Sequence, residues 1–184
     1  MVNIKINQTP YTVEEGTTIM DAAKIANVDI PHLCYLKEIN EIGACRLCCV
    51  EVEGENKLIP ACDNVVTEGM SIITNSPRVR KASRTNLELI MSKHNGNCTT
   101  CVRSGNCQLQ NLCIDFSLDT DLYERYHDPE KKLEWKEGYP LIRDNDKCIK
   151  CMRCIQICDK VQTMHIWDTI GTGKHTRVGT FDGR

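Results

Sequence analysis

The sequence is poor in aromatic residues and contains no long hydrophobic run. Its 184 residues include only two Phe, two Trp and five Tyr, so a large aromatic core is excluded and another organising element is expected. No stretch approaches the roughly 18 uncharged apolar residues of a membrane-spanning helix. The first residues show neither the apolar segment of a signal peptide nor a twin arginine, so we expect a cytoplasmic protein without a membrane span.

An excess of one charge is also missing. Lys and Arg number 23 against 25 Asp and Glu, for a formal net charge of −2. Nucleic-acid-binding proteins carry a basic face that attracts phosphates, and this charge balance shows none. We therefore expect no nucleic-acid partner.

Cysteine, by contrast, is abundant. The chain has 13 cysteines, whereas a disulfide-rich secreted domain favours an even count and an oxidising compartment. Cytoplasmic thiols stay reduced. Clustered cysteines in that setting are expected to bind metal or to perform redox chemistry.

The start of the chain predicts a small sheet followed by a helix. Residues 2–6 alternate apolar and polar side chains, as a half-buried strand does, and residues 11–13 form a second strand after a turn. Thr17 or Thr18 is expected to cap a helix that ends near Ala26. This order is typical of a β-grasp domain, although many α+β folds begin in the same way.

The rest of the chain alternates short strands with helices, which predicts an α+β protein. We expect strands at 49–52, 57–59, 70–73 and 140–144 and from Trp167 onward, and helices from Pro77, from Gln108 and near 152–162. Polar residues and a proline between 123 and 138 predict a connector.

The cysteines fall into three groups, and the first surrounds a glycine-containing loop. Its spacing is Cys34-x10-Cys45-x2-Cys48-x13-Cys62. Four thiolates around such a loop suit a 2Fe–2S cluster, because the backbone amides of the loop can stabilise the negative charge of the cluster. A structural zinc site also uses four thiolates, but the wide outer spacing after a β-grasp-like start favours iron and sulfur.

The second group is ambiguous from its residues alone. Its spacing is His94-x3-Cys98-x2-Cys101-x5-Cys107. Three thiolates converge, and the fourth ligand is either His94 or Cys113, with composition slightly favouring the cysteine. Zinc with three cysteines and one histidine fits the spacing nearly as well as an iron–sulfur cluster.

The third group is the strongest motif in the sequence. Its spacing is Cys148-x2-Cys151-x2-Cys154-x3-Cys158. This is the run of bacterial ferredoxins, with Asp159 in place of the usual proline, and it predicts a 4Fe–4S cluster. In two-cluster ferredoxins the fourth cysteine of such a run binds the other cluster. Either Cys158 therefore closes its own cluster, or its partner lies outside this chain.

Taken in order, the three groups resemble an arrangement that occurs in two related families. These are the N-terminal iron–sulfur relay of [FeFe]-hydrogenases and the large iron–sulfur subunit of bacterial NADH dehydrogenase (complex I). The resemblance covers essentially the whole chain and rests on residues 42–48 (IGACRLC), 98–107 (CTTCVRSGNC) and 146–151 (DKCIKC).

The resemblance implies three modules and a ligand set. It implies a β-grasp 2Fe–2S domain at 1–77, a small helical His/Cys3 4Fe–4S domain at 78–122, a connector at 123–139 and part of a bacterial-ferredoxin-like 4Fe–4S module at 140–184. It assigns the fourth ligand of the second site to His94. Cys49 and Cys113 are then spare, buried thiols.

The chain also departs from both families. Hydrogenases continue with a second four-cysteine run and a large catalytic domain, and neither is present here. The complex I subunit completes its third site with a cysteine some tens of residues downstream, which would fall past Arg184. We therefore expect either a fragment or a short subunit in which Cys158 supplies the missing ligand.

The implied function is the relay of single electrons between redox partners. The resemblance favours a short subunit of an electron-bifurcating NAD(P)H–ferredoxin oxidoreductase, with flavin and NAD(P)H on a partner subunit and ferredoxin as a further partner. No catalytic residue is expected in the chain itself. Two alternatives are the front end of an [FeFe]-hydrogenase without its hydrogen-activating domain and a zinc-stabilised interaction module.

Two other motifs carry little functional weight. Residues 171–175 (GTGKH) lack the upstream glycine and the Ser or Thr of a phosphate-binding loop. Arg78, Arg80, Lys81 and Arg84 form a basic patch that is expected to be a solvated helix face rather than a docking site.

Overall fold

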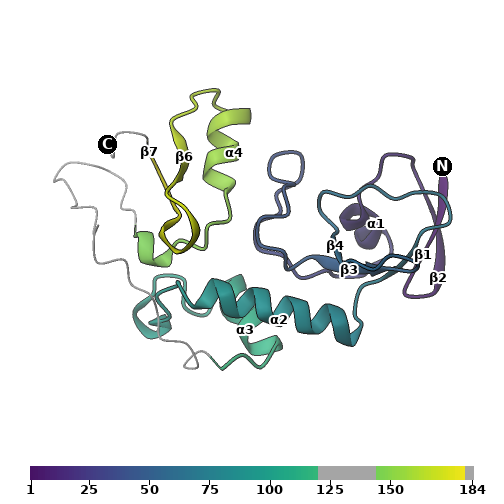
Figure 1. Ribbon diagram of the computed structural model, residues 1–184, viewed down its shortest axis with the longest axis horizontal. Helices are drawn as coiled ribbons and strands as arrows, with labels where there is room; N and C mark the ends of the chain where they lie inside the picture. Colours follow the sequence, from purple (N-terminus) through teal and green to yellow (C-terminus); the bar gives the residue numbers. More distant parts are fainter. Residues whose placement is uncertain (120–143, 181–184) are drawn as a thin grey trace.

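The computed structural model describes residues 1–119 and 144–180, which form a mixed α and β protein (Figure 1). The expected connector lies outside these residues, as does the expected strand at 140–144 except for Asp144. In chain order the elements are β1 (Val2–Ile6), β2 (Thr9–Val13), α1 (Ile19–Ile25), β3 (Cys49–Val52), β4 (Ile59–Pro60), β5 (Ser71–Ile73), α2 (Pro77–Met91), η1 (Cys98–Thr100), α3 (Gln108–Asp115), η2 (Asn145–Lys147), α4 (Arg153–Lys160), β6 (Trp167–Ile170), η3 (Gly173–His175) and β7 (Arg177–Thr180).

The first 73 residues build a five-stranded sheet in the order β2-β1-β5-β3-β4. β1 pairs parallel with β5, and the other neighbouring strands pair antiparallel. The strand expected at 57–59 is shifted, because Pro60 lies within β4 and pairs with Cys49. A proline is tolerated there since β4 is an edge strand.

A hydrophobic core lies between this sheet and α1. The expected alternation of β1 is confirmed, because Val2, Ile4 and Ile6 are all buried. Thr18 caps α1, as expected, by accepting a hydrogen bond from the backbone N–H of Asp21 at 3.1 Å. Cys48 and Cys62 belong to the same core. The first cysteine group is thus partly built into the packed interior.

The long helix α2 passes under the sheet and reaches the C-terminal part of the molecule (Figure 1). It begins after Ser76, whose side chain accepts from the backbone N–H of Val79, with Pro77 in the first turn. Its apolar face enters a second hydrophobic core. This core, here called the central core, consists of Leu33, Leu47, Leu87, Met91, Leu109, Leu112 and Cys113, with Cys45, Ile90, Cys107, Phe116, Leu118 and Ile149 packed around it.

Three segments that are far apart in the sequence therefore meet on α2. Ser83 donates from its hydroxyl to the carbonyl of Leu47 at 3.2 Å, and the Asn86 amide donates to the carbonyl of Arg46 at 2.8 Å. These contacts join α2 to the loop of the first cysteine group. Ile149 brings the third group to the same core.

The C-terminal part is helix α4 followed by the β6–β7 hairpin. The helix expected near 152–162 and the strand expected from Trp167 are both confirmed. Residues 171–175 form the turn of the hairpin, where Gly171 adopts a φ of 78° and has no room for a Cβ beside the His175 carbonyl. A structural role in the turn explains this glycine.

Among residues 1–119 and 144–180, no helix has both the length and the apolar character needed to span a membrane.

Two leucines of α2 test the importance of the central core. Leu87 is fully buried, whereas Leu89 is 63% exposed. We expect Leu87→Ala to lower the free energy of unfolding by about 2–5 kcal/mol, because it leaves a cavity. Leu89→Ala should change it by less than about 0.5 kcal/mol. Urea unfolding followed by circular dichroism measures both values, and equal losses would contradict a core at this face of α2.

Candidate functional site

The structure brings the first cysteine group together. A chain of hydrogen bonds links the side chains in the order Cys45, Cys34, Cys62, Cys48. Cys34, Cys48 and Cys62 are buried, and Cys45 is partly exposed. Residues that are up to 28 positions apart in the sequence thus form one cluster of sulfur atoms.

Backbone amides surround these sulfur atoms. The N–H of Cys45 donates to the Cys34 sulfur at 3.5 Å, and the N–H of Gly43 donates to Cys62. Gly43 adopts a φ of 61°, and a Cβ there would lie 3.1 Å from the Asp63 carboxylate. The glycine is therefore needed for this loop to bend around the site.

Crowding and burial raise the pKa of Cys34, Cys45 and Cys62 above the ordinary value of a thiol. The hydrogen bond from Cys45 lowers the pKa of Cys34, but the contact with Cys62 and burial outweigh it and the net pKa is raised. For Cys62, the hydrogen bond from Cys34 lowers the pKa, whereas the contact with Cys48 and burial raise it to about 12. Because metals bind the thiolate, filling this site releases protons.

The second group lines a cavity of about 300 Å³ next to the central core. The walls include His94, Cys98, Cys101, Cys107 and Cys113. Both candidates for the fourth ligand, His94 and Cys113, therefore face the same space. The geometry agrees with either assignment.

Cys113 lies deep in this site. It is buried on α3, and burial, followed by the nearby Cys98 and Cys107, raises its pKa to about 11. Cys107 immediately precedes α3, where the first N–H groups of the helix favour negative charge.

The third group wraps a tight loop before α4. Lys150 and Met152 both adopt positive φ values, 54° and 63°, which turn the chain sharply between the cysteines. Burial raises the pKa of Cys154, with the nearby Cys151 and Cys148 adding to it. These three side chains are therefore close together.

Cys158 lies on the same helix as Cys154, one turn further along. It is 2% exposed, and its sulfur accepts from the backbone N–H of Ile166 at 3.3 Å. The remaining thiol, Cys49, is buried in β3, and burial raises its pKa. The described structure places Cys158 in the interior between α4 and β6.

Within residues 1–119 and 144–180, no three or more His, Cys, Asp or Glu side chains converge on a point where one ion could be held. The first group supplies four neighbouring thiols, and the cavity of the second group is lined by His94 and four cysteines.

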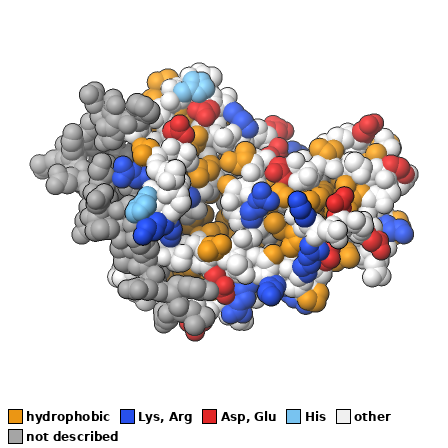
Figure 2. All heavy atoms as spheres, in the orientation of Figure 1, with side chains coloured by type: hydrophobic (Ala, Val, Ile, Leu, Met, Phe, Trp, Pro, Cys, Tyr) orange, Lys and Arg blue, Asp and Glu red, His pale blue; other side chains and the backbone are white. Residues whose placement is uncertain are grey.

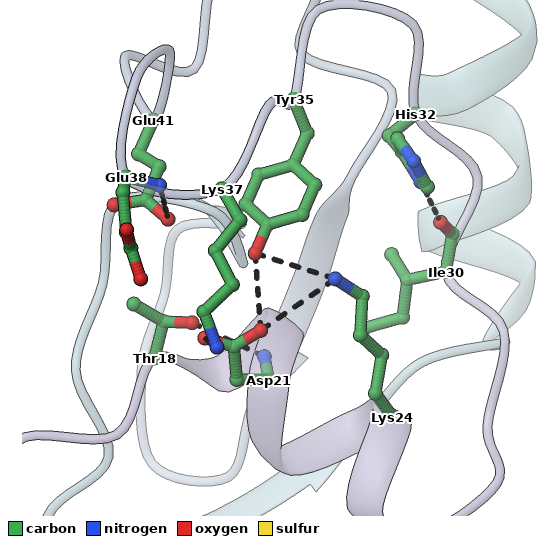
Figure 3. Close-up of polar contacts among 9 residues, drawn as sticks. All are labelled: Thr18, Asp21, Lys24, Ile30, His32, Tyr35, Lys37, Glu38 and Glu41. Carbon is green, nitrogen blue, oxygen red and sulfur yellow. Dashed lines mark hydrogen bonds and ion pairs between the residues drawn. The ribbon is translucent and has the colours of Figure 1, made fainter.

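A polar network, which the sequence did not reveal, fixes the residue next to Cys34 (Figure 3). The Tyr35 hydroxyl donates to Asp21 at 3.0 Å, and Lys24 and Lys37 lie 3.5 and 3.4 Å from the same carboxylate. The Lys24 ammonium also lies 4.3 Å from the centre of the Tyr35 ring. The network anchors the start of the loop that carries Cys34 to helix α1.

The expected basic patch on α2 is largely paired. Arg78 lies 3.5 Å from Glu51, and Arg84 lies 3.1 Å from Glu88. Figure 2 shows Lys and Arg side chains interspersed with acidic and apolar side chains on this view of the molecule. The basic patch on α2 is therefore better interpreted as a solvated helix face than as a docking site.

Two family models match the chain. Residues 1–77 match the 2Fe-2S iron-sulfur cluster binding domain. Residues 84–121 match the NADH-ubiquinone oxidoreductase-G iron-sulfur binding region. The first match contains all four cysteines of the first group, and the second contains His94 and the cysteines of the second group.

Several known proteins are similar over nearly the whole chain. The NADP-reducing hydrogenase subunit HndD of Solidesulfovibrio fructosivorans is 40% identical over 94% of the chain and 30% of its own length. The NADH-ubiquinone oxidoreductase 75 kDa subunit of Reclinomonas americana is 32% identical over 98% of the chain and 26% of its own length. The chain thus spans less than a third of these relatives.

A solved structure has the same fold. The NAD+-reducing [NiFe]-hydrogenase in the H2-reduced state matches 100% of the chain and 77% of its own chain, with a TM-score of 0.78 and 26% identity. The expected resemblance to hydrogenase and complex I iron–sulfur regions is confirmed.

The Asp21 network predicts a pH-dependent contribution to stability. Burial raises the pKa of Asp21, but the Tyr35 hydrogen bond and the two lysines outweigh it, so the net pKa lies below 3.8. A carboxylate with a lowered pKa stabilises the fold above its unfolded pKa, near 3.9, and this contribution is lost as the pH falls through the folded value.

We therefore expect Asp21→Asn to lower the free energy of unfolding by about 0.5 kcal/mol at pH 7, because solvent screens these pairs. The difference from the native chain should shrink below about pH 4. Urea unfolding across this pH range measures it, with Asp29→Asn at an exposed position as the control. A difference that grows at low pH would contradict the assignment.

Proposed function

We propose that the chain holds three iron–sulfur clusters. The assigned ligands are Cys34, Cys45, Cys48 and Cys62 for a 2Fe–2S cluster, His94, Cys98, Cys101 and Cys107 for one 4Fe–4S cluster, and Cys148, Cys151, Cys154 and Cys158 for another. The observation that carries this proposal is the hydrogen-bonded chain of four thiols within residues that match a 2Fe-2S cluster binding domain.

The proposed modules follow these ligand groups. Residues 1–77 would form the β-grasp domain, 78–122 the helical His/Cys3 domain and 140–184 the ferredoxin-like module, with 123–139 as the connector. The five-stranded sheet with α1 supports the first assignment, and the helices α2 and α3 around the cavity support the second.

Bound clusters would supply one-electron redox chemistry, which the protein positions and tunes. Backbone N–H groups at Gly43 and Cys45 donate to ligand sulfur atoms and favour the more negative, reduced state. His94 is a neutral ligand, whereas a cysteine would add a negative charge. The second site is therefore easier to reduce with His94 than with a fourth thiolate.

The proposed role is an electron-transfer subunit of a multi-subunit, flavin-dependent NAD(P)H–ferredoxin oxidoreductase of the electron-bifurcating type. The names of the relatives support an NAD(P)H-linked complex, among them an NADPH-Fe(3+) oxidoreductase subunit alpha from Geobacter sulfurreducens that is 32% identical. Flavin and NAD(P)H would then be bound by partner subunits, with ferredoxin as a further partner. A cytoplasmic location keeps the thiols reduced.

A second candidate is the electron-relay part of an [FeFe]-hydrogenase. It is favoured by the 40% identity to HndD, of which the chain covers only 30%. The zinc-stabilised interaction module is the least supported alternative, because the first 77 residues match a 2Fe-2S iron-sulfur cluster binding domain. Hydrogen evolution by the complex purified from its source would favour the hydrogenase role.

Iron and sulfide analysis of the anaerobically prepared chain tests the cluster assignment. We expect about 10 iron atoms per chain, with electron paramagnetic resonance (EPR) signals from three reduced clusters. Cys158→Ala should convert the third cluster to a three-iron form, whereas Cys49→Ala should keep all the iron. About 6 iron atoms in the native chain would show that Cys158 does not close the third site, and a colourless zinc protein would overturn the function.

Substitution of the histidine tests the second site. We expect His94→Cys to lower the reduction potential of that cluster by at least about 59 mV, a tenfold change in a one-electron equilibrium, because a thiolate adds negative charge. Cys113→Ala should leave its potential and iron content unchanged. An EPR-monitored redox titration measures both variants. Loss of a cluster in Cys113→Ala, with no shift in His94→Cys, would reassign the fourth ligand.

A further inference from the structure

A buried asparagine joins the loops of the first and third cysteine groups. Asn40 has no exposed surface. Its side-chain nitrogen donates to the carbonyl of Cys34 at 2.7 Å and to the carbonyl of Cys151 at 2.9 Å. The two bonded cysteines are proposed ligands of different clusters. One amide group therefore spans the boundary between two sites.

The side-chain amide of Asn40 can serve both carbonyls from one position. The Asn40 nitrogen carries two N–H donors, whereas a carboxylate of the same shape carries none. Within the described part of the chain, the Asn40 oxygen is buried without a hydrogen-bond partner. An unsatisfied buried oxygen is costly, so the two bonds from the nitrogen must stabilise this arrangement strongly enough to offset it.

An arginine makes a second connection at the same place. Arg153, at the start of α4, donates from Nε to the Cys34 carbonyl at 3.0 Å and from Nη2 to the Tyr35 carbonyl at 2.8 Å. Lys160, at the end of the same helix, donates to the Ile39 carbonyl at 2.8 Å. Figure 1 shows the loop after α1 extending toward α4.

The loop that receives these bonds is itself rigid. Leu36 and Asn40 exchange backbone hydrogen bonds of 3.2 and 2.7 Å. Tyr35 is held from the opposite side by Asp21. A displacement of α4 would therefore break several bonds at once rather than bend the loop.

We propose that Asn40 and Arg153 are positioning residues that hold the first and third cluster sites at a fixed separation, and that the charge of Arg153 makes the first site easier to reduce. This inference rests on the proposed function for its redox part only. Electron tunnelling falls steeply with distance, so a fixed separation would keep transfer between the two sites fast. The guanidinium stabilises the added electron because it lies on the backbone of a ligand to that site.

Hydrogen–deuterium exchange tests the positioning role without relying on clusters. In the full chain, Asn40→Asp and Arg153→Gln should each raise the exchange rate of the peptide that contains the backbone amides of residues 36 and 40. The increase should be severalfold, because the loop loses its contacts with α4. Asn56→Asp and Arg80→Gln, both at exposed positions outside this junction, are matched controls and should leave the peptide unchanged. Equal exchange in the native chain and both junction variants would overturn the positioning role.

Redox titration of the cluster-loaded chain tests the charge effect. Arg153→Gln should lower the reduction potential of the 2Fe–2S cluster, which corresponds to a severalfold smaller equilibrium constant for its reduction. Arg153→Lys keeps the charge and should retain most of the native potential. Arg80→Gln should cause no shift. Equal potentials in the Gln and Lys variants would overturn the electrostatic role, since a purely structural effect would not follow the charge.

Spin–spin broadening in the fully reduced EPR spectrum reports the separation of the two clusters. We expect Asn40→Asp to alter the broadening at unchanged iron content, and Asn56→Asp, at an exposed position, to preserve it. If Asn40→Asp fails to bind iron, the comparison of Arg153→Gln with Arg153→Lys tests the proposed role of the junction. A native chain that binds no iron would refute the proposed function and the charge effect, while the exchange experiment would still decide the positioning role.

Discussion

The packing of Leu87 of α2 with Leu47, in the loop of the first cysteine group, is the interaction on which the other parts depend. Leu87 and Leu47 are almost completely buried in the central core. Cysteines of the first two groups and Ile149 of the third pack around them. Since the sequence has few aromatic residues, this modest aliphatic core must position all three groups. The groups therefore cannot be regarded as independent modules on a flexible chain.

The protein meets opposing demands at these sites. Thiolates bind metal, but burial and neighbouring sulfur atoms favour the protonated thiol, as the raised pKa of Cys62 shows. Backbone N–H groups and helix starts supply compensating positive charge, and the irons of bound clusters would add to it. The loops around Cys45 and Cys151 accordingly contain residues with positive φ, and the backbone N–H groups of Gly43 and Cys45 donate to the sulfur atoms of Cys62 and Cys34. Gly43, Lys150 and Met152 show this backbone geometry.

The similarity to several oxidoreductases concerns one region of those proteins. The chain aligns with hydrogenase and NADH-ubiquinone oxidoreductase subunits over less than a third of their length. Proteins with different overall activities therefore share this arrangement of sites. Such a region is suited to carry electrons, since a relay depends on the spacing and potentials of its centres rather than on a particular substrate.

The sequence by itself determined most of the described helices and strands and the three groups of clustered cysteines. Alternation in residues 2–6, the helix start at Pro77 and the spacing of Cys148 to Cys154 are local patterns, and local backbone geometry is enough to interpret them. The small shift of β4 arose because an edge strand accepts a proline that a central strand would reject.

Only the tertiary structure decided which distant groups meet. It placed Cys113 in the cavity with His94, and it brought Asn40 to Cys151, 111 residues away. No local periodicity encodes such contacts, because they arise when separate segments pack on one helix and share a core. Asn40 belongs to no motif, and its importance follows from a buried amide that satisfies two carbonyls from different parts of the chain.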